Sequence, residues 1–226
     1  MKQWWKRVVV FPLLQNIARY LYRVHVFGEE NLPTGVPVVF ASNHASHFDT
    51  PLLISLLGQW ARRQGIMLYV VGARDYWGAE RGIKALMREC FHVLLIERGS
   101  GAIKQVRHDL TAISQVLHRG HAVIMYPEGG RQSNPLCRAS FKEGVSVITR
   151  KVDSVPLCVV PVFLWGTHLV WPKRKRFFSL RLLFRARIRV KFGEVIDPHH
   201  YPTDTLLARA IEQAVDDLRQ QYTDAA

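Results

Sequence analysis

The sequence predicts an α/β protein with one domain, built on a mixed, largely parallel central sheet flanked by helices. Short apolar runs typical of buried strands alternate with longer segments of helical periodicity. The chain has 226 residues, 48% of them hydrophobic, which is enough for one substantial core. No Gly/Ser-rich or Pro-rich linker and no repeat divides it.

An amphipathic helical segment is expected over residues 1–24, ahead of a domain that covers 25–226. Basic side chains alternate there with aromatic and aliphatic ones, including Trp4 and Trp5. The longest uncharged apolar run, 8–14, contains a proline and is far shorter than the roughly 20 residues that span a bilayer. The pattern favours a segment lying in a membrane interface. The alternative is a helix that packs its apolar face on the domain.

The first half of the domain alternates strands and helices. Thr50 and Pro51 suit the N-cap and the first position of a helix. Apolar residues from Ile66 to Val71 indicate a strand. In chain order we expect strands within 25–41, a helix over 51–63, a strand over 66–73, helical structure over 75–90, a strand over 92–97 and a helix over 101–119.

The second half continues the alternation. The run 155–164 is almost continuously apolar and predicts a buried strand, whose prolines suggest a sheet edge or a strand end. In 181–192 basic residues alternate with apolar ones, which predicts a strand with one basic and one apolar face. The remaining expected elements are a strand over 122–126 and helices over 140–151 and 205–222.

His44 and Asp49 lie five positions apart, between a buried strand and the 51–63 helix. On a continuous helix this spacing points side chains about 140° apart. The two therefore meet most easily if His44 lies in the loop and Asp49 at the mouth of the helix. Asp49 would then bind one imidazole nitrogen and leave the other as a base. Two alternatives stay open: ordinary turn residues, or a metal site that also uses His47.

A second polar cluster follows the strand that Pro127 ends. Gly129 and Gly130 permit a tight backbone and the close approach of a ligand. Glu128 can accept hydrogen bonds from hydroxyl groups, and Arg131 can hold a phosphate through two parallel hydrogen bonds. Taken alone, these residues also fit a glycine-rich turn with a solvated ion pair.

Four blocks in order resemble the glycerolipid acyltransferases typified by bacterial 1-acyl-glycerol-3-phosphate acyltransferase. The family pattern is Asn-His-x4-Asp, a strand ending in Arg (here Arg98), Phe-Pro-Glu-Gly-Thr-Arg-Ser and an apolar strand with Val-Pro. The resemblance covers roughly residues 25–195. Residues 141–144 also resemble the Phe-Lys-x-Gly that follows the third block in many members.

The chain departs from the family pattern at five positions. Tyr126 replaces Phe, Gly130 replaces Thr, and Gln132 separates the arginine from the serine of the third block. His92 stands where Gly is usual, and Leu95 where Phe is common. Gly130 removes one hydroxyl from the expected substrate site and leaves the identity of the acceptor open.

The resemblance implies acyl transfer from an acyl thioester, acyl-CoA or acyl carrier protein, to the free hydroxyl of a lysophospholipid. The acceptor it favours is 1-acyl-sn-glycerol 3-phosphate, which would give phosphatidic acid. His44 would be the general base and Asp49 would orient it. Neither a cofactor nor a metal is expected, and the chain has no Gly-x-Ser-x-Gly elbow for a serine nucleophile.

Substrate-binding residues follow from the same resemblance. Two arginines suit a phosphate monoester. The acyl chain needs an apolar groove, for which the 52–57 helix is a candidate lining and core packing the alternative. The residues expected to hold the acceptor are Glu128, Gly129, Arg131 and Arg98, with Lys142 and Arg74 as weaker candidates.

The formal net charge of +13 favours a polyanionic partner, either nucleic acid or anionic lipid. Basic residues lie beside aromatic ones in 1–24 and 171–178, which favours lipid headgroups. Strands with interleaved aromatics for base stacking are not evident, so no nucleic-acid partner is expected. We expect a peripheral or monotopic protein on the cytoplasmic face of the cell membrane. The sequence does not predict its oligomeric state.

Two rival functions remain. One is an acyltransferase for another lysophospholipid or amphiphilic alcohol. The other is a noncatalytic basic protein that binds membranes or nucleic acid, which would have no need for the His44, Asp49 and Glu128 combination. Three cysteines are scattered without pair spacing, which fits reduced thiols.

Overall fold

The computed structural model describes residues 22–98, 103–152, 155–173 and 186–223. Most of the predicted amphipathic segment lies outside the described residues, as do 174–178 of the basic zone and the start of the predicted 181–192 strand. Within the described ranges, no helix is long and apolar enough to cross a membrane.

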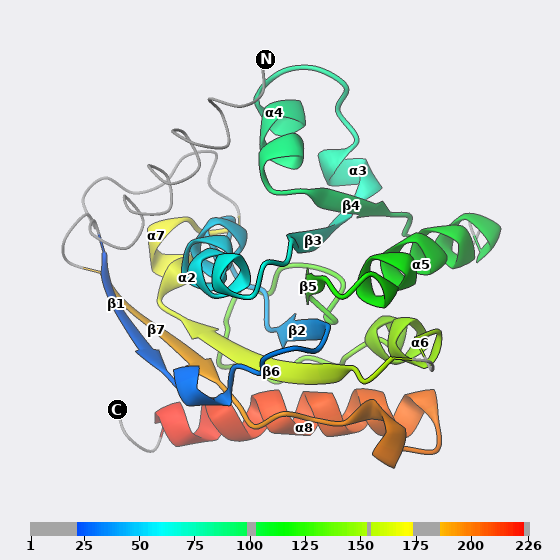
Figure 1. Cartoon of the computed structure of the whole chain (residues 1–226). Helices are drawn as coiled ribbons and strands as arrows, with labels where there is room; N and C mark the ends of the chain where they lie inside the picture. The colour runs from blue at the N-terminus through cyan, green and yellow to red at the C-terminus, as the bar shows by residue number, and fades with distance from the viewer. Residues whose placement is uncertain (1–21, 99–102, 153–154, 174–185, 224–226) are drawn as a thin grey trace.

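Seven strands form one sheet in the described part of the chain. They are β1 (Arg23–Phe27), β2 (Val38–Ser42), β3 (Leu68–Ala73), β4 (Val93–Ile96), β5 (Ala122–Met125), β6 (Cys158–Trp165) and β7 (Arg187–Phe192). Their order is β1-β7-β6-β2-β5-β3-β4. All neighbouring pairs are parallel except β6 and β7. The predicted mixed, largely parallel sheet is confirmed (Figure 1).

Helices cover both faces of this sheet, and α8 runs along β6 in Figure 1. They are α2 (Asp49–Arg63), α3 (Arg74–Trp77), α4 (Ile83–Cys90), α5 (Ile103–His118), α6 (Gly144–Arg150), α7 (Thr167–Val170) and α8 (Asp204–Thr223). Two short 3-10 turns, η2 (Glu29–Asn31) and η5 (Pro198–His200), complete the described elements.

Strand β2 shows how the core is divided. Its side chains alternate, so that Val38 and Phe40 join Leu53 of α2 in one apolar cluster. Val39 and Ala41 face the opposite side and join a second cluster with α5, α6 and α8. A strand buried on both faces reads as a continuous apolar run, as this one does. The end of β2 is therefore held rigidly between two layers of helices.

Two predicted helix boundaries were wrong in ways that concern the site. Helix α2 begins at Asp49, two residues before Pro51, with Phe48 as its N-cap. Thr50 is therefore inside the first turn, and its hydroxyl lies 3.0 Å from Tyr126 Oη. The helical region predicted over 75–90 is two helices, because residues 78–82 interrupt it.

The prolines of 155–164 do not mark a sheet edge, because β6 lies between β7 and β2. Pro156 lies just before the start of β6, and Pro161 lies within it. Pro161 is tolerated where the β6–β7 ladder is interrupted. That ladder begins at Val162, and the next pairing across β6 is an isolated bridge at Val159. The Pro161 carbonyl still accepts a hydrogen bond from Gly193 N at 2.8 Å.

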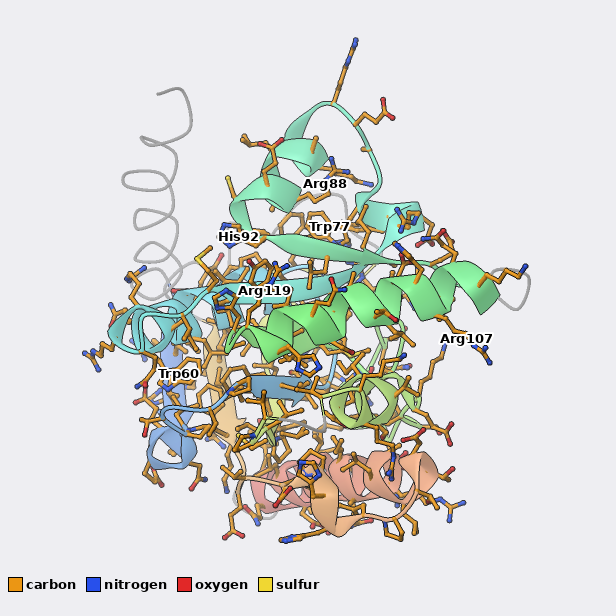
Figure 2. The ribbon with its side chains drawn as sticks, turned by 45° about the vertical axis from the view of Figure 1, so that its right-hand side comes forward. Trp60, Trp77, Arg88, His92, Arg107 and Arg119 are labelled. Atoms are coloured by element: carbon orange, nitrogen blue, oxygen red, sulfur yellow. The ribbon has the colours of Figure 1, made fainter. Side chains whose placement is uncertain are left out.

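Trp77, Met87 and Phe91, at the corner between α4 and β4, line one side of a cavity. Figure 2 labels Trp77, Arg88 and His92 in this region. Trp77 packs edge-on against Phe91, with ring centroids 6.4 Å apart, and Arg88 donates a hydrogen bond to the Trp77 carbonyl. A Cβ at Gly72 would lie 2.5 Å from the Trp77 ring, so a glycine is needed there. His92 has φ of 47°, the left-handed region in which glycine is favoured, and glycine is usual at this position in the family pattern.

Candidate active site

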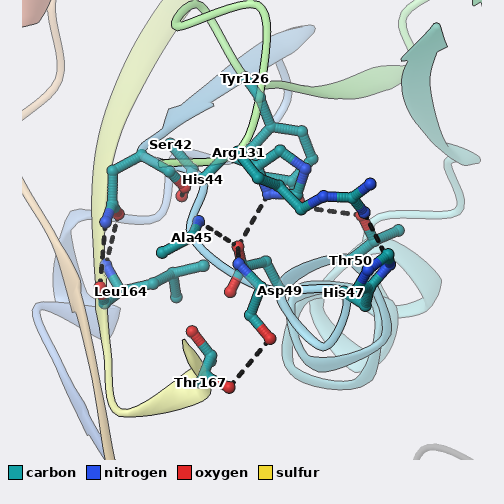
Figure 3. A network of polar contacts seen from close by, with 12 residues as sticks. Ser42, His44, Ala45, His47, Asp49, Thr50, Tyr126, Arg131, Leu164 and Thr167 are labelled. Carbon is teal, nitrogen blue, oxygen red and sulfur yellow. Dashed lines mark hydrogen bonds and ion pairs between the residues drawn. The ribbon is translucent and has the colours of Figure 1, made fainter. Parts of the chain in front are cut away.

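His44 and Asp49 meet in the loop between β2 and α2, as predicted (Figure 3). His44 Nδ1 lies 2.8 Å from Asp49 Oδ2, and the Asp49 side chain is fully buried. The same oxygen accepts hydrogen bonds from the backbone N–H groups of Ala45 and Ser46, both at 2.8 Å. Because a carboxylate only accepts, Nδ1 of His44 carries a proton, which in the neutral imidazole leaves the lone pair on Nε2.

The ring of Tyr126 fixes the plane of His44. The two rings stack with centroids 4.0 Å apart and an interplanar angle of 16°. The Tyr126 hydroxyl is held by Thr50. Burial raises the pKa of Tyr126 well above its ordinary value, so the phenol is neutral beside the histidine.

Buried polar side chains anchor the His44 loop at both ends. The side-chain amide of Asn43 binds the backbone of Leu164 as a neighbouring strand would. It donates to the Leu164 carbonyl at 3.0 Å and accepts from the Leu164 N–H at 2.7 Å. Ser46 Oγ lies 2.9 and 2.8 Å from the carbonyls of Thr167 and Trp171. Ser46 is fully buried and is therefore a structural residue of the loop.

The Glu128 carboxyl contacts the backbone of His44. It accepts hydrogen bonds from the His44 backbone N–H and from the Gln132 side chain. Its Oε2 atom is buried without a hydrogen-bond partner. Burial, assisted by the negative charge of Asp49, raises the pKa of Glu128 to about 8. Glu128 thus supports the His44 loop and does not line the main cavity beside it.

A cavity of about 560 Å³ opens beside His44. Its apolar part lies between β3, β5 and the helices α4 to α6, and is lined by Val70, Phe91, Val106, Leu110 and Val147. Its polar part carries more positive than negative side chains. The basic ones are His47, Lys84, Arg98, Arg131 and Lys142, and the carboxylates in the same wall are Asp75, Glu97 and Glu143. An amphiphilic molecule with an anionic head and an apolar tail matches this division.

Of the two roles considered for the 52–57 helix, groove lining and core packing, the structure shows core packing. Leu52, Leu53 and Leu57 have no exposed surface, and they pack in the core between α2 and the sheet. From this helix only Thr50 and Pro51, in its first turn, reach the cavity wall. Core packing, the alternative considered for these leucines, is therefore their role.

Arg98, Gly129 and Lys142 come together at the cavity wall. Arg98 Nη1 donates to the Gly129 carbonyl at 2.9 Å, and Nη2 lies 2.5 Å from a carboxylate oxygen of Asp75. The hydrogen bond from Arg98 holds the pKa of Asp75 below its usual value. Gly129 has φ of 69°, and a Cβ there would lie 2.8 Å from Lys142 Nζ. Glycine therefore lets the lysine cross the turn.

Arg131 is held by residues that the motif did not predict as its neighbours. Its Nη1 lies 2.7 Å from His47 Nδ1, and its guanidinium sits over the Tyr76 ring, 4.7 Å from the centroid. Lys84 Nζ lies 4.2 Å from the same centroid. Sequence reasoning missed Tyr76 and Lys84 because no motif marks them; Lys84 was visible only as one charge in a predicted helix.

The side chain of Arg74 does not line the cavity. Its guanidinium pairs with Asp109 at 3.0 Å and with Glu97 at 3.2 Å. These contacts tie β3 and the end of β4 to α5, and the role of Arg74 as a weaker candidate ligand stays a prediction. For the metal alternative, the described residues contain no group of three His, Cys, Asp or Glu arranged to hold an ion.

Comparison with known proteins identifies the family of the chain. The sequence profile of the Acyltransferase family matches residues 23–165. The match spans more than half of the chain, so this protein belongs to the acyltransferase family and is an enzyme of the O-acyltransferase class.

A solved structure supports the fold. The crystal structure of the 1-acyl-sn-glycerophosphate (LPA) acyltransferase PlsC from Thermotoga maritima is similar to this chain with a TM-score of 0.72 and 20% sequence identity. The similarity covers 96% of this chain and 81% of that chain. At this identity the likeness establishes a common fold. No curated protein matches the sequence.

Proposed function

We propose that the enzyme transfers a fatty acyl group from an acyl thioester to the free hydroxyl of a lysophospholipid, with 1-acyl-sn-glycerol 3-phosphate as the preferred acceptor. The observation that carries this proposal is the position of His44. Its Nδ1 is hydrogen-bonded to Asp49, and the ring lines a cavity with a basic and an apolar part.

His44 acts as the general base in this proposal. Nε2 takes the proton from the acceptor hydroxyl while the oxygen attacks the thioester carbonyl carbon. The resulting imidazolium is stabilised by Asp49, whose Oδ2 is already held by two backbone N–H groups. When the tetrahedral intermediate collapses, the C–S bond breaks and the imidazolium returns its proton to the departing sulfur. The products are the ester and a free thiol.

Arg131 is the principal phosphate ligand in this scheme. A guanidinium presents paired donors that match two phosphate oxygens. Arg98 contributes less of its charge, because Asp75 already pairs with it. Lys84 and Lys142 add positive charge in the same wall. This arrangement supports an acceptor with a phosphate headgroup over one with a zwitterionic headgroup.

We also propose that the enzyme works at the cytoplasmic face of the cell membrane, where its amphiphilic substrate resides. Support comes from the sequence of residues 1–24, with Trp4 and Trp5 beside basic residues. Replacing both tryptophans by alanine should reduce cosedimentation with anionic vesicles. Unchanged cosedimentation of the folded variant would remove this segment as the anchor.

The proposed function is tested by product analysis. The purified enzyme is incubated with acyl-CoA or acyl carrier protein thioesters and with an array of lysophospholipids, and the products are identified by mass spectrometry. Phosphatidic acid as the dominant product supports the proposal. Preferential acylation of a zwitterionic lysophospholipid would favour the rival acceptor, and the absence of any acylated lipid would reject the function.

A further inference from the structure

His47 lies between His44 and Asp49 in the sequence, but its side chain does not take part in the hydrogen bond between these two residues. It turns toward the basic wall of the cavity, where Figure 3 shows it facing Arg131. The ring is half-buried against two aromatic side chains, with centroid distances of 5.2 Å to Trp171 and 5.9 Å to Tyr76. This packing fixes where both ring nitrogens point.

The partners of His47 define its protonation. Arginine can only donate, so Nδ1, 2.7 Å from Arg131 Nη1, is the acceptor and carries no proton. A backbone carbonyl can only accept, so Nε2, 3.3 Å from the Lys173 carbonyl oxygen, carries the proton. The Tyr76 hydroxyl also lies 3.0 Å from Nδ1. His47 is therefore the neutral imidazole with its proton on Nε2.

We infer that His47 is a positioning residue for Arg131: as a neutral imidazole it holds the guanidinium over the Tyr76 ring and turned to the acceptor phosphate, and it releases it when protonated. The inference rests on the proposed function, in which Arg131 binds that phosphate. An arginine side chain loses rotamer freedom when it is fixed. Because His47 and Tyr76 already fix the guanidinium, phosphate binding causes a smaller further loss of rotamer freedom.

Protonation would reverse the contact, because two cationic donors would then face each other at hydrogen-bond distance. Several groups face His47: Arg131, His44, Asp49 and Tyr76, with the Lys173 carbonyl at Nε2. Burial, followed by the charges of Arg131 and His44, lowers the pKa of His47, against the Lys173 carbonyl and Asp49, which raise it. The imidazole is consequently neutral at neutral pH, and the contact is lost only on acidification.

The experiment compares three substitutions by steady-state kinetics with a soluble short-chain lysophosphatidate and saturating acyl-CoA. His47→Phe removes the acceptor atom while keeping a ring. His47→Asn restores an acceptor oxygen near the place of Nδ1. His200→Phe, at a histidine whose side chain is 79% exposed, is the matched control. If the Phe ring does not fit beside Trp171, His47→Leu makes the same deletion.

The expected result separates binding from chemistry. His47→Phe should raise the acceptor KM about three- to tenfold, the effect of one ordinary hydrogen bond, with kcat nearly unchanged. His47→Asn should recover most of this loss, and His200→Phe should match the wild type. In an Arg131→Ala background, His47→Phe should have no further effect on the acceptor KM, since residues that act through each other are not additive.

A pH profile gives a second readout. The acceptor phosphate itself titrates near pH 6, so only differences between proteins count. On acidification the acceptor KM of the wild type should rise more steeply than that of His47→Asn, which has no imidazole to protonate at this position. A structural role alone would not produce this difference.

Two outcomes separate the inference from the proposed function. If Arg131→Ala raises the acceptor KM but folded His47→Phe does not, or if their effects add, the positioning role of His47 is wrong and the proposed function stands. If Arg131→Ala itself leaves the acceptor KM unchanged, the phosphate assignment is wrong and the inference about His47 falls with it.

Discussion

Asp49 Oδ2 lies 2.8 Å from His44 Nδ1 and accepts two backbone hydrogen bonds with the same oxygen. The three donors converge from one loop, so the carboxylate is oriented by the backbone before any substrate binds. This relationship determines the tautomer of His44 and exposes the Nε2 lone pair for chemistry. The site thus depends on the rigidity of the connection between β2 and α2.

Asp49→Asn should lower kcat at least about 100-fold, because an amide cannot stabilise the imidazolium and its NH2 favours the wrong tautomer of His44. Steady-state kinetics measures the effect, with circular dichroism to establish that the variant is folded. A folded variant with kcat within threefold of the wild type would show that the pair has only a structural role.

Arg131→Lys should raise the acceptor KM about tenfold while the thioester KM changes little. Lysine keeps the charge but loses the planar fork, and a point charge cannot reproduce both the contact with His47 and the position over Tyr76. Varying each substrate in turn measures the two constants. A shift in the thioester KM alone would move the phosphate site elsewhere.

Glu128→Gln should change the pH dependence of stability. Burial raises the pKa of Glu128 to about 8 in the folded protein, against an ordinary value of 4.5. Between these values the unfolded chain has lost a proton that the folded chain retains, so the wild type is stabilised below about pH 4.5 and loses this contribution as pH rises toward 8. Glutamine stays neutral, and so this loss should disappear.

Urea unfolding at several pH values between about 5 and 8.5 measures this effect, which should be on the order of a few kcal/mol at most. Because the carboxyl supports the His44 backbone, we also expect only a modest change in the acceptor KM. An acceptor KM raised 100-fold, with an unchanged pH profile of stability, would indicate that Glu128 contacts the acceptor directly.

Gly129→Ala should destabilise the protein by about 1–2 kcal/mol, the cost of a left-handed conformation with a side chain. It should also raise the acceptor KM, because the new Cβ displaces Lys142 and disturbs the carbonyl held by Arg98. Gly130→Ala is the matched control, since a Cβ there meets no atom within 4 Å. Thermal unfolding and kinetics of both variants provide the comparison, and equal effects would contradict this reason for Gly129.

Much of the fold could be predicted because both faces of the sheet are buried, which makes its strands continuous apolar runs between helices. The interior position of β6 was left open, because a proline such as Pro161 normally signals an edge or a strand end. Pro161 fits inside the sheet because the pairing between β6 and β7 is interrupted there. This interruption involves Gly193, which is distant in the sequence. Local patterns carry no information about such pairings.

The site was predictable where a motif brings its own residues together. His44 and Asp49 met as expected because only the four residues 45–48 separate them. The pairing of Arg74 with Asp109 and Glu97 could not be predicted, because a charged residue at the end of a strand does not reveal which side of the sheet it faces. The contact of His47 with Arg131 joins residues 84 positions apart. The contact of Glu128 with the His44 backbone also joins residues from different strand ends. No short sequence pattern could therefore predict either contact.

His44→Ala tests the central claim most directly. The measurement is the rate of acylated lipid formation, followed by mass spectrometry, for a variant shown to be folded by circular dichroism. Replacement of the exposed His25 by alanine is the control. The mechanism predicts a fall in kcat of at least about 100-fold for His44→Ala and none for His25→Ala. Near-normal turnover by folded His44→Ala would contradict its assignment as the general base.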